Sequence, residues 1–203
     1  PLNKIIGIYN FLSHRTTENS TFTIENFLEC LDNQSNRNYE LLNQTDQSIE
    51  VKINQMDRYK IWLLKSGVVD RIDYIVNNSL VSVSHYDKTL NNVEEYHNGK
   101  LIKRTFYEIN GNPCYEQFYV NNEISVTFID GQILYGKMAF YQYFFQQLNL
   151  QQNDVVIIDR PLDVIEGILP VLANKVRLFS VVHAEHYLSL IHISEPTRPE
   201  PIS

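Results

Sequence analysis

Five dipeptides of the kind that form tight hairpin turns recur along the middle of the chain. They are Asn77-Asn78, Asn98-Gly99, Asn110-Gly111, Asn121-Asn122 and Asp130-Gly131. Asn, Asp and Gly tolerate the positive φ angles that two-residue turns between antiparallel strands require. From Asn98 onward the pairs are about 9 to 12 residues apart, which leaves room for one strand and one turn in each interval. The pattern therefore predicts a β-meander.

The segments between these turns have the composition of β-strands. RIDYIV, LVSVSHY, KLIKRTFYEI, CYEQFYV and EISVTFI alternate in polarity or are rich in β-branched and aromatic residues. The interval from Asn77 to Asn98 is about twice as long as the others, and DKTLNN within it supplies the missing turn. VKIN and YKIWLLKSG extend the pattern upstream. We predict an antiparallel sheet of roughly six to eight strands over residues 49–133.

The sequence before the meander has other signals. STFTIENFLECL predicts a short amphipathic helix, with Thr23 as its N-cap and Glu25 in its first turn. The Asn- and Gln-rich residues 32–47 that follow are typical of a loop. IIGIYNF, close to Pro1, predicts a buried strand inside a domain, so we expect the natural protein to contain sequence before this point.

After the meander the hydrophobic period changes from two to about 3.6 residues. GKMAFYQYFFQQLNL predicts a helix, with Phe140, Phe144 and Leu148 on one face. VVIID and VRLFSVVH are continuous apolar strands, and PLDVIEGILPVLANK between them predicts a helix. Such a strand–helix–strand unit is typical of a parallel sheet that is covered on both faces.

These elements define the expected fold class, which is α+β: an antiparallel β-meander inserted in a partial Rossmann-like α/β domain. We expect residues 1–32 to belong to the Rossmann-like domain and residues 33–135 to form the inserted sheet. Residues 136–187 return to the Rossmann-like domain. Residues 188–203, with three prolines, fit neither helix nor interior strand and resemble the translated read-through of a sequencing adapter, so we expect a non-native or disordered tail.

Charge and cysteine content exclude several classes of function. Seventeen Lys and Arg against 24 Asp and Glu give a net charge of −7, which disfavours binding to a nucleic-acid backbone. The apolar runs are too short to span a bilayer and no secretory leader opens the chain, so we expect a cytoplasmic protein. Cys30 and Cys114 have no CxxC or His-rich spacing around them, so the sequence predicts part-buried thiols and neither a disulfide framework nor a zinc site.

Two polar clusters follow the two predicted parallel strands. Asp159 and Arg160 come directly after VVIID, and His183 and His186 follow LFSVV. The structural interpretation is that Asp159 caps a helix, Arg160 pairs with an acid and the histidines lie at a strand end. The functional interpretation is that both clusters meet at one sheet edge, where ligands of α/β folds bind. The HAEH sequence lacks the HExxH spacing of zinc proteases, so no metal is expected there.

KRTFYEINGNPCYEQFY, ILYGKMAFYQYFFQQLNLQQNDVVIIDR and VRLFSVVHAEHY, in this order, resemble a known family. It comprises bacterial glycosyltransferases of the GT-B type that carry an inserted extended β-sheet domain. The group includes the accessory-Sec N-acetylglucosaminyltransferases of serine-rich repeat adhesins and the teichoic-acid α-glycosyltransferases. The resemblance is clearest over residues 101–187 and looser over residues 5–100.

The resemblance implies retaining transfer from a UDP-sugar, which is a substrate, with no cofactor and no metal. By the matching motif His183 would face the donor sugar as a catalytic residue, while His186, Asp159 and Arg160 would bind substrate. The acceptor would be a serine-rich surface protein or teichoic acid, and a partner glycosyltransferase subunit and peripheral membrane contact are compatible with this group. The family's paired glutamates and phosphate-binding residues lie in a C-terminal domain beyond this sequence, so we expect the fragment alone to be inactive.

One departure from the accessory-Sec pattern concerns the acceptor. Residues 161–164, Pro-Leu-Asp-Val, replace a glycine-containing continuation and look more like the teichoic-acid branch. A second hypothesis, from a different class, is a non-catalytic stabilising subunit. Its meander would bind a partner transferase or an acceptor polypeptide through edge strands and an aromatic face.

Overall fold

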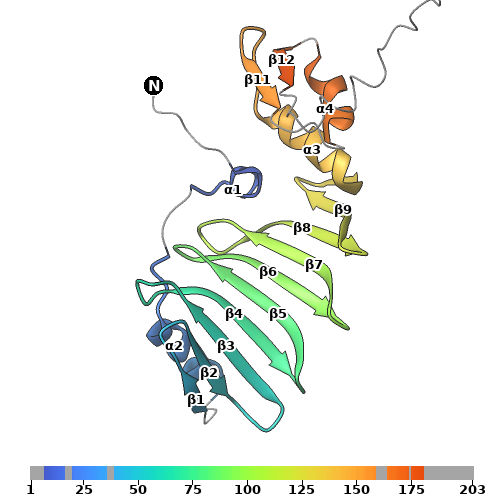
Figure 1. Ribbon diagram of the computed structural model, residues 1–203. Helices are drawn as coiled ribbons and strands as arrows, with labels where there is room; N and C mark the ends of the chain where they lie inside the picture. Colours follow the sequence, from blue (N-terminus) through green and yellow to red (C-terminus); the bar gives the residue numbers. More distant parts are fainter. Residues whose placement is uncertain (1–6, 17–19, 36–38, 159–163, 174, 181–203) are drawn as a thin grey trace, which may run out of the picture. The chain divides into compact units, whose positions relative to one another are not determined.

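Ten strands joined by short connections form one antiparallel sheet in which every strand pairs with its neighbours in the sequence (Figure 1). The computed structural model describes residues 7–16, 20–35, 39–158, 164–173 and 175–180. The chain divides into two units, 1–137 and 138–203, and the sheet belongs to the first. The strands are β1 (Glu40–Gln44), β2 (Ser48–Lys52), β3 (Asp57–Leu63), β4 (Val69–Val76), β5 (Ser79–Tyr86), β6 (Leu90–His97), β7 (Lys100–Tyr107), β8 (Pro113–Val120), β9 (Glu123–Ile129) and β10 (Gln132–Tyr135).

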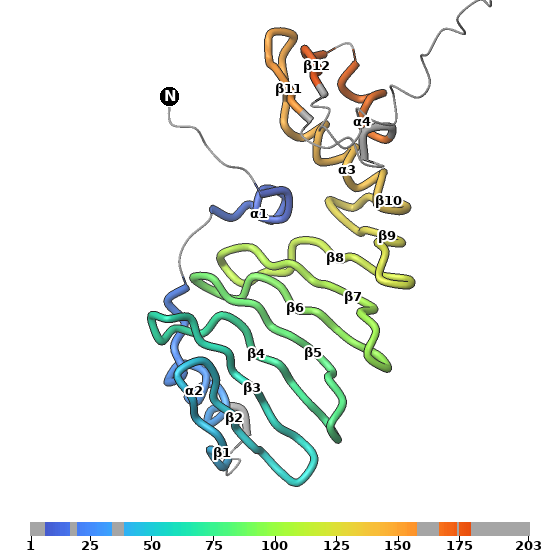
Figure 2. Tube along the Cα trace, viewed as in Figure 1, coloured from blue at the N-terminus to red at the C-terminus, as the bar shows by residue number. Residues whose placement is uncertain are grey.

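The dipeptides that predicted the meander form its turns, as the chain trace shows (Figure 2). Four of the five pairs have positive φ at both residues: 77–78, 98–99, 121–122 and 130–131. The pair 110–111 differs, because only Gly111, at φ 85°, is in the left-handed region. There the loop is longer and is closed by a hydrogen bond from the Glu108 amide to the Asn112 carbonyl, at 2.9 Å. The predicted turn after β5 is confirmed over residues 87–89.

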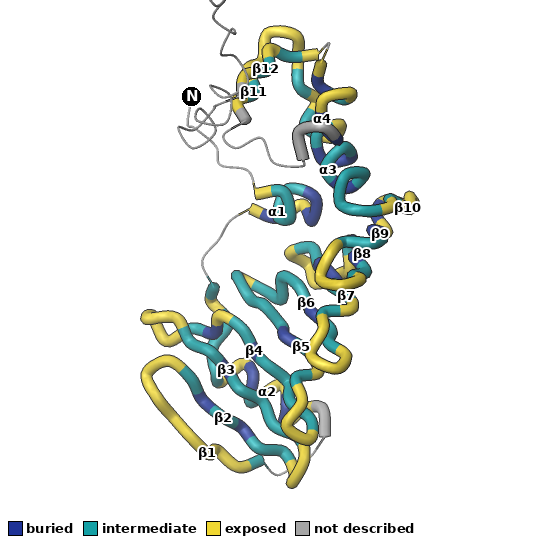
Figure 3. The backbone as a smooth tube through the Cα atoms, turned by 45° about the vertical axis from the view of Figure 1, so that its right-hand side comes forward, coloured by how far each residue is buried: buried dark blue, intermediate teal, exposed yellow. Residues whose placement is uncertain are grey.

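The predicted number of strands was too low because the sheet has an unpredicted strand at each end, β1 and β10. β1 lies inside the predicted loop 32–47, and α2 (Ile24–Ser35) also extends into it. All five residues of β1 are exposed, as the yellow outer strand in Figure 3 shows. With no buried face, β1 has no alternating pattern to detect. Backbone pairing with β2, such as Leu41 opposite Val51, defines it instead.

The helix α2 covers one face of the sheet at the β2–β4 end. Its start is confirmed: Thr23 precedes it, and the Thr23 hydroxyl accepts a hydrogen bond from the Asn26 amide at 3.4 Å. Phe27 packs edge-on against Tyr59 with ring centroids 5.2 Å apart. The apolar core under this helix consists of buried residues from α2 and the three strands β2, β3 and β4: Phe27, Leu31, Ile49, Val51, Ile61, Val69 and Ile72.

The strand predicted for IIGIYNF is wrong over its described part, which is the helix α1 (Ile8–Leu12). A short apolar run has no period that separates a strand from a buried helix turn. Tertiary contacts determine the outcome: the Tyr9 ring stacks on Phe106 at 5.2 Å, and the Tyr115 hydroxyl points to the Tyr9 carbonyl at 3.4 Å.

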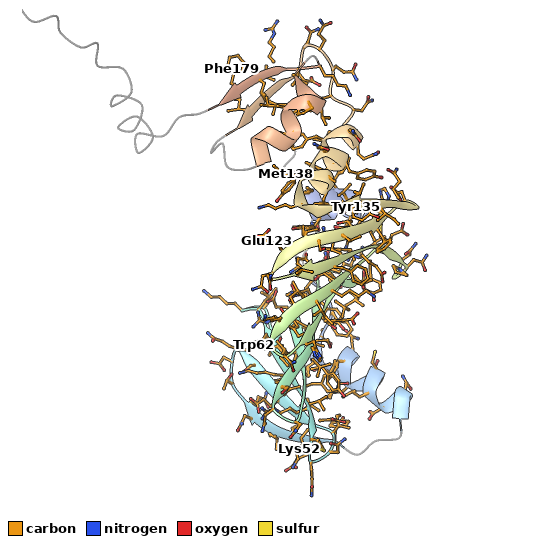
Figure 4. The ribbon with its side chains drawn as sticks, turned by 90° about the vertical axis from the view of Figure 1, so that its right-hand side faces the viewer. Lys52, Trp62, Glu123, Tyr135, Met138 and Phe179 are labelled. Carbon is orange, nitrogen blue, oxygen red and sulfur yellow. The ribbon has the colours of Figure 1, made fainter. Side chains whose placement is uncertain are left out.

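The helices α1 and α2 lie on opposite faces of the sheet. Residues directly opposite in neighbouring strands share a face. The register Trp62–Arg71–His85–Asn92–Phe106 places the α1 contact Phe106 on the face of Trp62. Ile61 and Ile72, which contact α2, point the other way. Figure 4, which views the sheet close to its edge, shows Trp62 and α2 on opposite sides.

The second unit contains the predicted strand–helix–strand pattern. Its elements are α3 (Gly136–Gln147), β11 (Val155–Ile158), α4 (Val164–Leu172) and β12 (Arg177–Ser180). β11 and β12 are parallel, with Val155 opposite Arg177 and Ile158 opposite Ser180. Gly167 lets α4 approach α3 closely, because a Cβ at this position would lie 2.9 Å from the Met138 sulfur.

Three further expectations concern the tail, membrane spans and the cysteines. The tail 188–203 lies outside them. Among the helices that the structure describes, none combines the length and apolar character needed to cross a bilayer. Cys114 is half-buried, but Cys30 is exposed and does not match the expected part-buried thiol. Cys30 lies on α2, whose other side faces the sheet through Phe27 and Leu31.

Candidate functional site

The four residues predicted to form a site, Asp159, Arg160, His183 and His186, all lie outside the described residues. The strands that precede them are described. The last pair of the β11–β12 register is Ile158 opposite Ser180, so the carboxyl ends of both strands lie at the same edge. Asp159 follows β11 directly and His183 comes three residues after β12. The site at this edge therefore stays a prediction.

A second candidate lies among the described residues, on the face of the sheet that carries Trp62. Polar side chains from β3 to β9 form a band here, which we call the polar row. Its members are Trp62, Arg71, Asp73, His85, Glu94, Tyr96, Arg104, Gln117, Tyr119 and Thr127, and hydrogen bonds, ion pairs or ring contacts link them in groups.

Glu94 is at the centre of the polar row and is only 9% exposed. Its Oε2 accepts a hydrogen bond from the Tyr96 hydroxyl at 2.6 Å, and its Oε1 forms an ion pair with Arg104. His85 Nε2 lies 3.6 Å from the same carboxylate, just beyond hydrogen-bond range. Three side chains from β5, β6 and β7 thus converge on one carboxylate.

Electrostatics keep Glu94 and Tyr96 each in one protonation state near neutral pH. Burial raises the pKa of Glu94, but the facing His85 and Tyr96 groups and the Arg104 charge outweigh it and lower the pKa to about 2. Burial, with the Glu94 carboxylate next to the hydroxyl, raises the pKa of Tyr96 to about 12. Because neither group changes charge near pH 7, the pair suits charge pairing and recognition better than proton transfer.

Trp62 marks one end of the polar row and is held in a fixed orientation. Its indole N–H donates to Asp73 Oδ2 at 2.7 Å. The Lys60 ammonium lies 4.2 Å and the Arg71 guanidinium 4.9 Å from the ring centroid. An open hollow of about 840 Å³ adjoins Trp62 and Arg71, and it is also lined by Lys65 from the β3–β4 connection and by Asp70 at the start of β4. Charges of both signs make this hollow suitable for a polar ligand.

Gln117 and Thr127 form the other end of the polar row, and both side chains are fully buried. The Gln117 carbonyl accepts a hydrogen bond from the Tyr119 hydroxyl at 2.8 Å, and its amide donates to the Thr127 hydroxyl at 3.5 Å. The Arg104 guanidinium lies 5.7 Å from the Tyr119 ring centroid and connects this end to Glu94. The polar row thus continues from Glu94 to β9.

A buried arginine attaches the segment after α1 to this face. The Arg15 side chain is 0% exposed and forms an ion pair with Asp87 in the β5–β6 turn. Its Nη1 also donates to the carbonyls of Leu90 and Tyr107, at 3.1 and 3.0 Å. Burial raises the pKa of Asp87, but the hydrogen bonds from Arg15 and Asn91 outweigh it and hold the pKa below its usual value.

Sequence reasoning identified none of these residues, although one signal was present. A turn at Asn98-Gly99 places Glu94 near Arg104 in the paired strands, with one irregularity of register between Glu95 and Tyr96. The predicted turn was therefore enough to suggest the Glu94–Arg104 pair. Nothing in the sequence indicated Arg15, because its partner Asp87 is 72 residues away.

Comparisons with known proteins agree on the fold. No protein-family model matches the chain. The UDP-N-acetylglucosamine–peptide N-acetylglucosaminyltransferase GtfA subunit of Limosilactobacillus reuteri subsp. suis is 28% identical over 205 residues, which cover 91% of this chain and 38% of that protein. The chain thus spans well under half the length of the curated relatives it matches.

Two solved structures have the same arrangement of elements. One is the pneumococcal O-GlcNAc transferase GtfA in complex with UDP and GlcNAc, at TM-score 0.79 and 23% identity, covering 90% of this chain and 37% of that one. The other is a GtfA/B complex, at TM-score 0.78 and 24% identity, covering 89% and 36%. These likenesses confirm the predicted α+β class, and the expected resemblance to this group of glycosyltransferases is confirmed as well.

Proposed function

We propose that the chain is part of a retaining, UDP-sugar-dependent glycosyltransferase that transfers a hexosyl or N-acetylglucosaminyl group to a serine-rich surface protein or teichoic acid. The observation that carries the proposal is the match of 91% of the chain to GtfA subunits together with the fold of a transferase solved with UDP and GlcNAc. The parallel β11–β12 pair supports it, because its shared carboxyl edge is where Asp159 and His183 follow in the sequence.

The domain division proposed for the whole protein follows the sequence. Residues 1–32 and 136–187 would belong to a Rossmann-like domain, residues 33–135 would be the inserted sheet, and residues 188–203 would be a non-native or disordered tail. The donor would be held mainly by a C-terminal domain beyond this chain. A cytoplasmic location, with peripheral membrane contact, is part of the same proposal.

The chemistry requires stabilisation of charge on the leaving diphosphate. Glycosyl transfer passes through an oxocarbenium-like state while negative charge develops on the departing group, so fixed hydrogen bonds and positive charges lower the barrier. His183 would hydrogen-bond the donor sugar or leaving group and orient it, and His186 would assist. Asp159 and Arg160 would contact the acceptor side.

The decisive experiment uses the full-length enzyme and radiolabelled UDP-GlcNAc or UDP-glucose with a serine-rich repeat polypeptide or teichoic acid. We expect transfer to one acceptor class, and a loss of most activity, about 10²-fold or more, in His183→Ala with unchanged thermal stability. His97→Ala, a change at an exposed histidine at the end of β6, is the matched control. Wild-type turnover by His183→Ala would remove the catalytic role, and transfer to neither acceptor would remove the proposal.

A second function, binding of a partner subunit, is favoured by one observation. β1 is an exposed edge strand that carries two exposed apolar side chains, Leu41 at 53% and Leu42 at 42%. Such an edge is a template for pairing with another chain. If the partner is a second transferase subunit, Leu41→Lys should weaken co-purification of the two full-length proteins while leaving the fold intact. Unchanged co-purification would argue against this edge.

A further inference from the structure

Three side chains of the types that bind transition metals meet where α1 adjoins the β7–β8 hairpin. His14 follows α1, Glu108 follows β7 and Cys114 is the second residue of β8. One nitrogen, one carboxylate oxygen and the sulfur all lie within 4.8 Å of one another. His14 and Cys114 are 100 positions apart in the sequence, so only the folded chain brings them together.

The surrounding backbone holds each of the three residues in place. His14 lies between the buried residues Ser13 and Arg15, which are 1% and 6% exposed. The Cys114 thiol donates to the Leu12 carbonyl at 3.3 Å, so the sulfur already lies against the end of α1. Glu108 closes the hairpin loop, since its carbonyl accepts the Gly111 amide at 2.9 Å.

The charges around the sulfur favour a cation. Burial first, and then the carboxylates of Glu108 and Asp130, raise the pKa of the Cys114 thiol. The Glu108 carboxylate lies within 4.8 Å of the sulfur. Together with a thiolate and a neutral imidazole, the Glu108 carboxylate would balance the two charges of a divalent cation.

We propose that His14, Glu108 and Cys114 form a site for a divalent transition-metal cation of the zinc class, which fastens α1 to the β7–β8 hairpin. Thiolate, imidazole and carboxylate are the ligands that zinc uses in proteins, and a water molecule completes four-fold coordination. Zinc-bound ligand atoms lie roughly 3.3 to 3.8 Å apart, as bond lengths of about 2.0 to 2.3 Å require. The exposed His14 side chain can rotate to close the remaining distance. On binding, the Cys114 proton passes to solvent and its hydrogen bond to the Leu12 carbonyl is replaced by the metal bond.

The test is a titration of the full chain with Co²⁺, which reports a thiolate ligand by a sulfur-to-cobalt charge-transfer band in the near ultraviolet. We expect one Co²⁺ per chain, displaced by Zn²⁺, and a band that is lost in Cys114→Ser. Cys30→Ser, at the exposed cysteine on α2, is the matched control and should keep the band. His14→Ala should weaken binding by more than about tenfold.

The proposal is overturned by a wild-type chain without the band, or by a band of equal intensity in Cys114→Ser. Because His14 is exposed, its replacement keeps the test valid if Cys114→Ser does not fold. Unchanged Co²⁺ affinity in a folded His14→Ala variant would also exclude the site. None of these readouts depends on glycosyl transfer, so they are independent of the proposed enzyme.

Discussion

The two faces of the meander are made from the same strands but are held together differently. On the α2 face, apolar side chains such as Val51, Ile61 and Ile72 pack without polar partners into one core. On the opposite face, Glu94 and Arg104 pair across neighbouring strands, and the buried Arg15 attaches the segment after α1. Under α2 the sheet is thus stabilised by apolar burial, whereas around Glu94 and Arg15 it is stabilised by paired charges. The charge pairs of Arg15 and Glu94 stabilise the sheet only when each partner is in position, because an unpaired buried charge is costly.

The largest effect is expected from removal of the Arg15 charge. Arg15→Met removes the ion-pair partner of Asp87 and the side-chain donor to the carbonyls of Leu90 and Tyr107, so the free energy of unfolding should fall by about 4 kcal/mol. Urea denaturation followed by the fluorescence of Trp62, the one Trp of the chain, measures the stability of the sheet. Arg58→Met, which removes an exposed hydrogen bond to Asn78, should cost less than about 0.5 kcal/mol. Equal costs for both variants would mean that the charged face adds no special stability.

A somewhat smaller effect is expected on the apolar face. Ile61 is 0% exposed, so Ile61→Ala should lower the free energy of unfolding by about 3 kcal/mol through lost burial and the cavity left behind. The same denaturation experiment applies. Ile102→Ala, at a position that is 41% exposed, should cost less than about 1 kcal/mol. A small cost at Ile61 would show that the α2 face can collapse around the cavity, and the contrast between the faces would then be overstated.

The smallest effect is expected at Glu94, where the stability of the sheet should depend on pH. The folded-state pKa of Glu94, about 2, is below the ordinary value of 4.5. Its carboxylate therefore stabilises the sheet fully above about pH 5, and this contribution is lost as the pH falls toward 2. Glu94→Gln should cost about 1 to 2 kcal/mol at neutral pH, and its stability should fall less steeply than that of the wild type between pH 5 and 2. If wild type and Glu94→Gln lose stability in parallel between pH 5 and 2, Glu94 is not responsible for the acid sensitivity. Glu95→Gln, on the other face, is the control.

The meander was predictable because its signals are local. The pairs at 77–78, 98–99, 121–122 and 130–131 supply the positive φ that a tight turn requires, and alternation between them sets the strands. The same reasoning failed for β1, which has no buried face, and for α1, whose apolar run fits either a strand or a helix turn. At the candidate sites, the sequence pointed to Asp159, Arg160, His183 and His186, whereas the described polar row around Glu94 was missed.

The sequence by itself determined the antiparallel sheet, the helix that begins after Thr23 and the parallel strand–helix–strand unit, because turn geometry and hydrophobic period act over a few residues. Only the tertiary structure decided which face carries α1, and that Arg15 meets Asp87 and His14 meets Cys114. These contacts join residues 72 and 100 positions apart, and a single buried charge or ligand has no period in the sequence. The Arg15–Asp87 and His14–Cys114 contacts form only after the ten-strand sheet has folded and placed the partners next to each other.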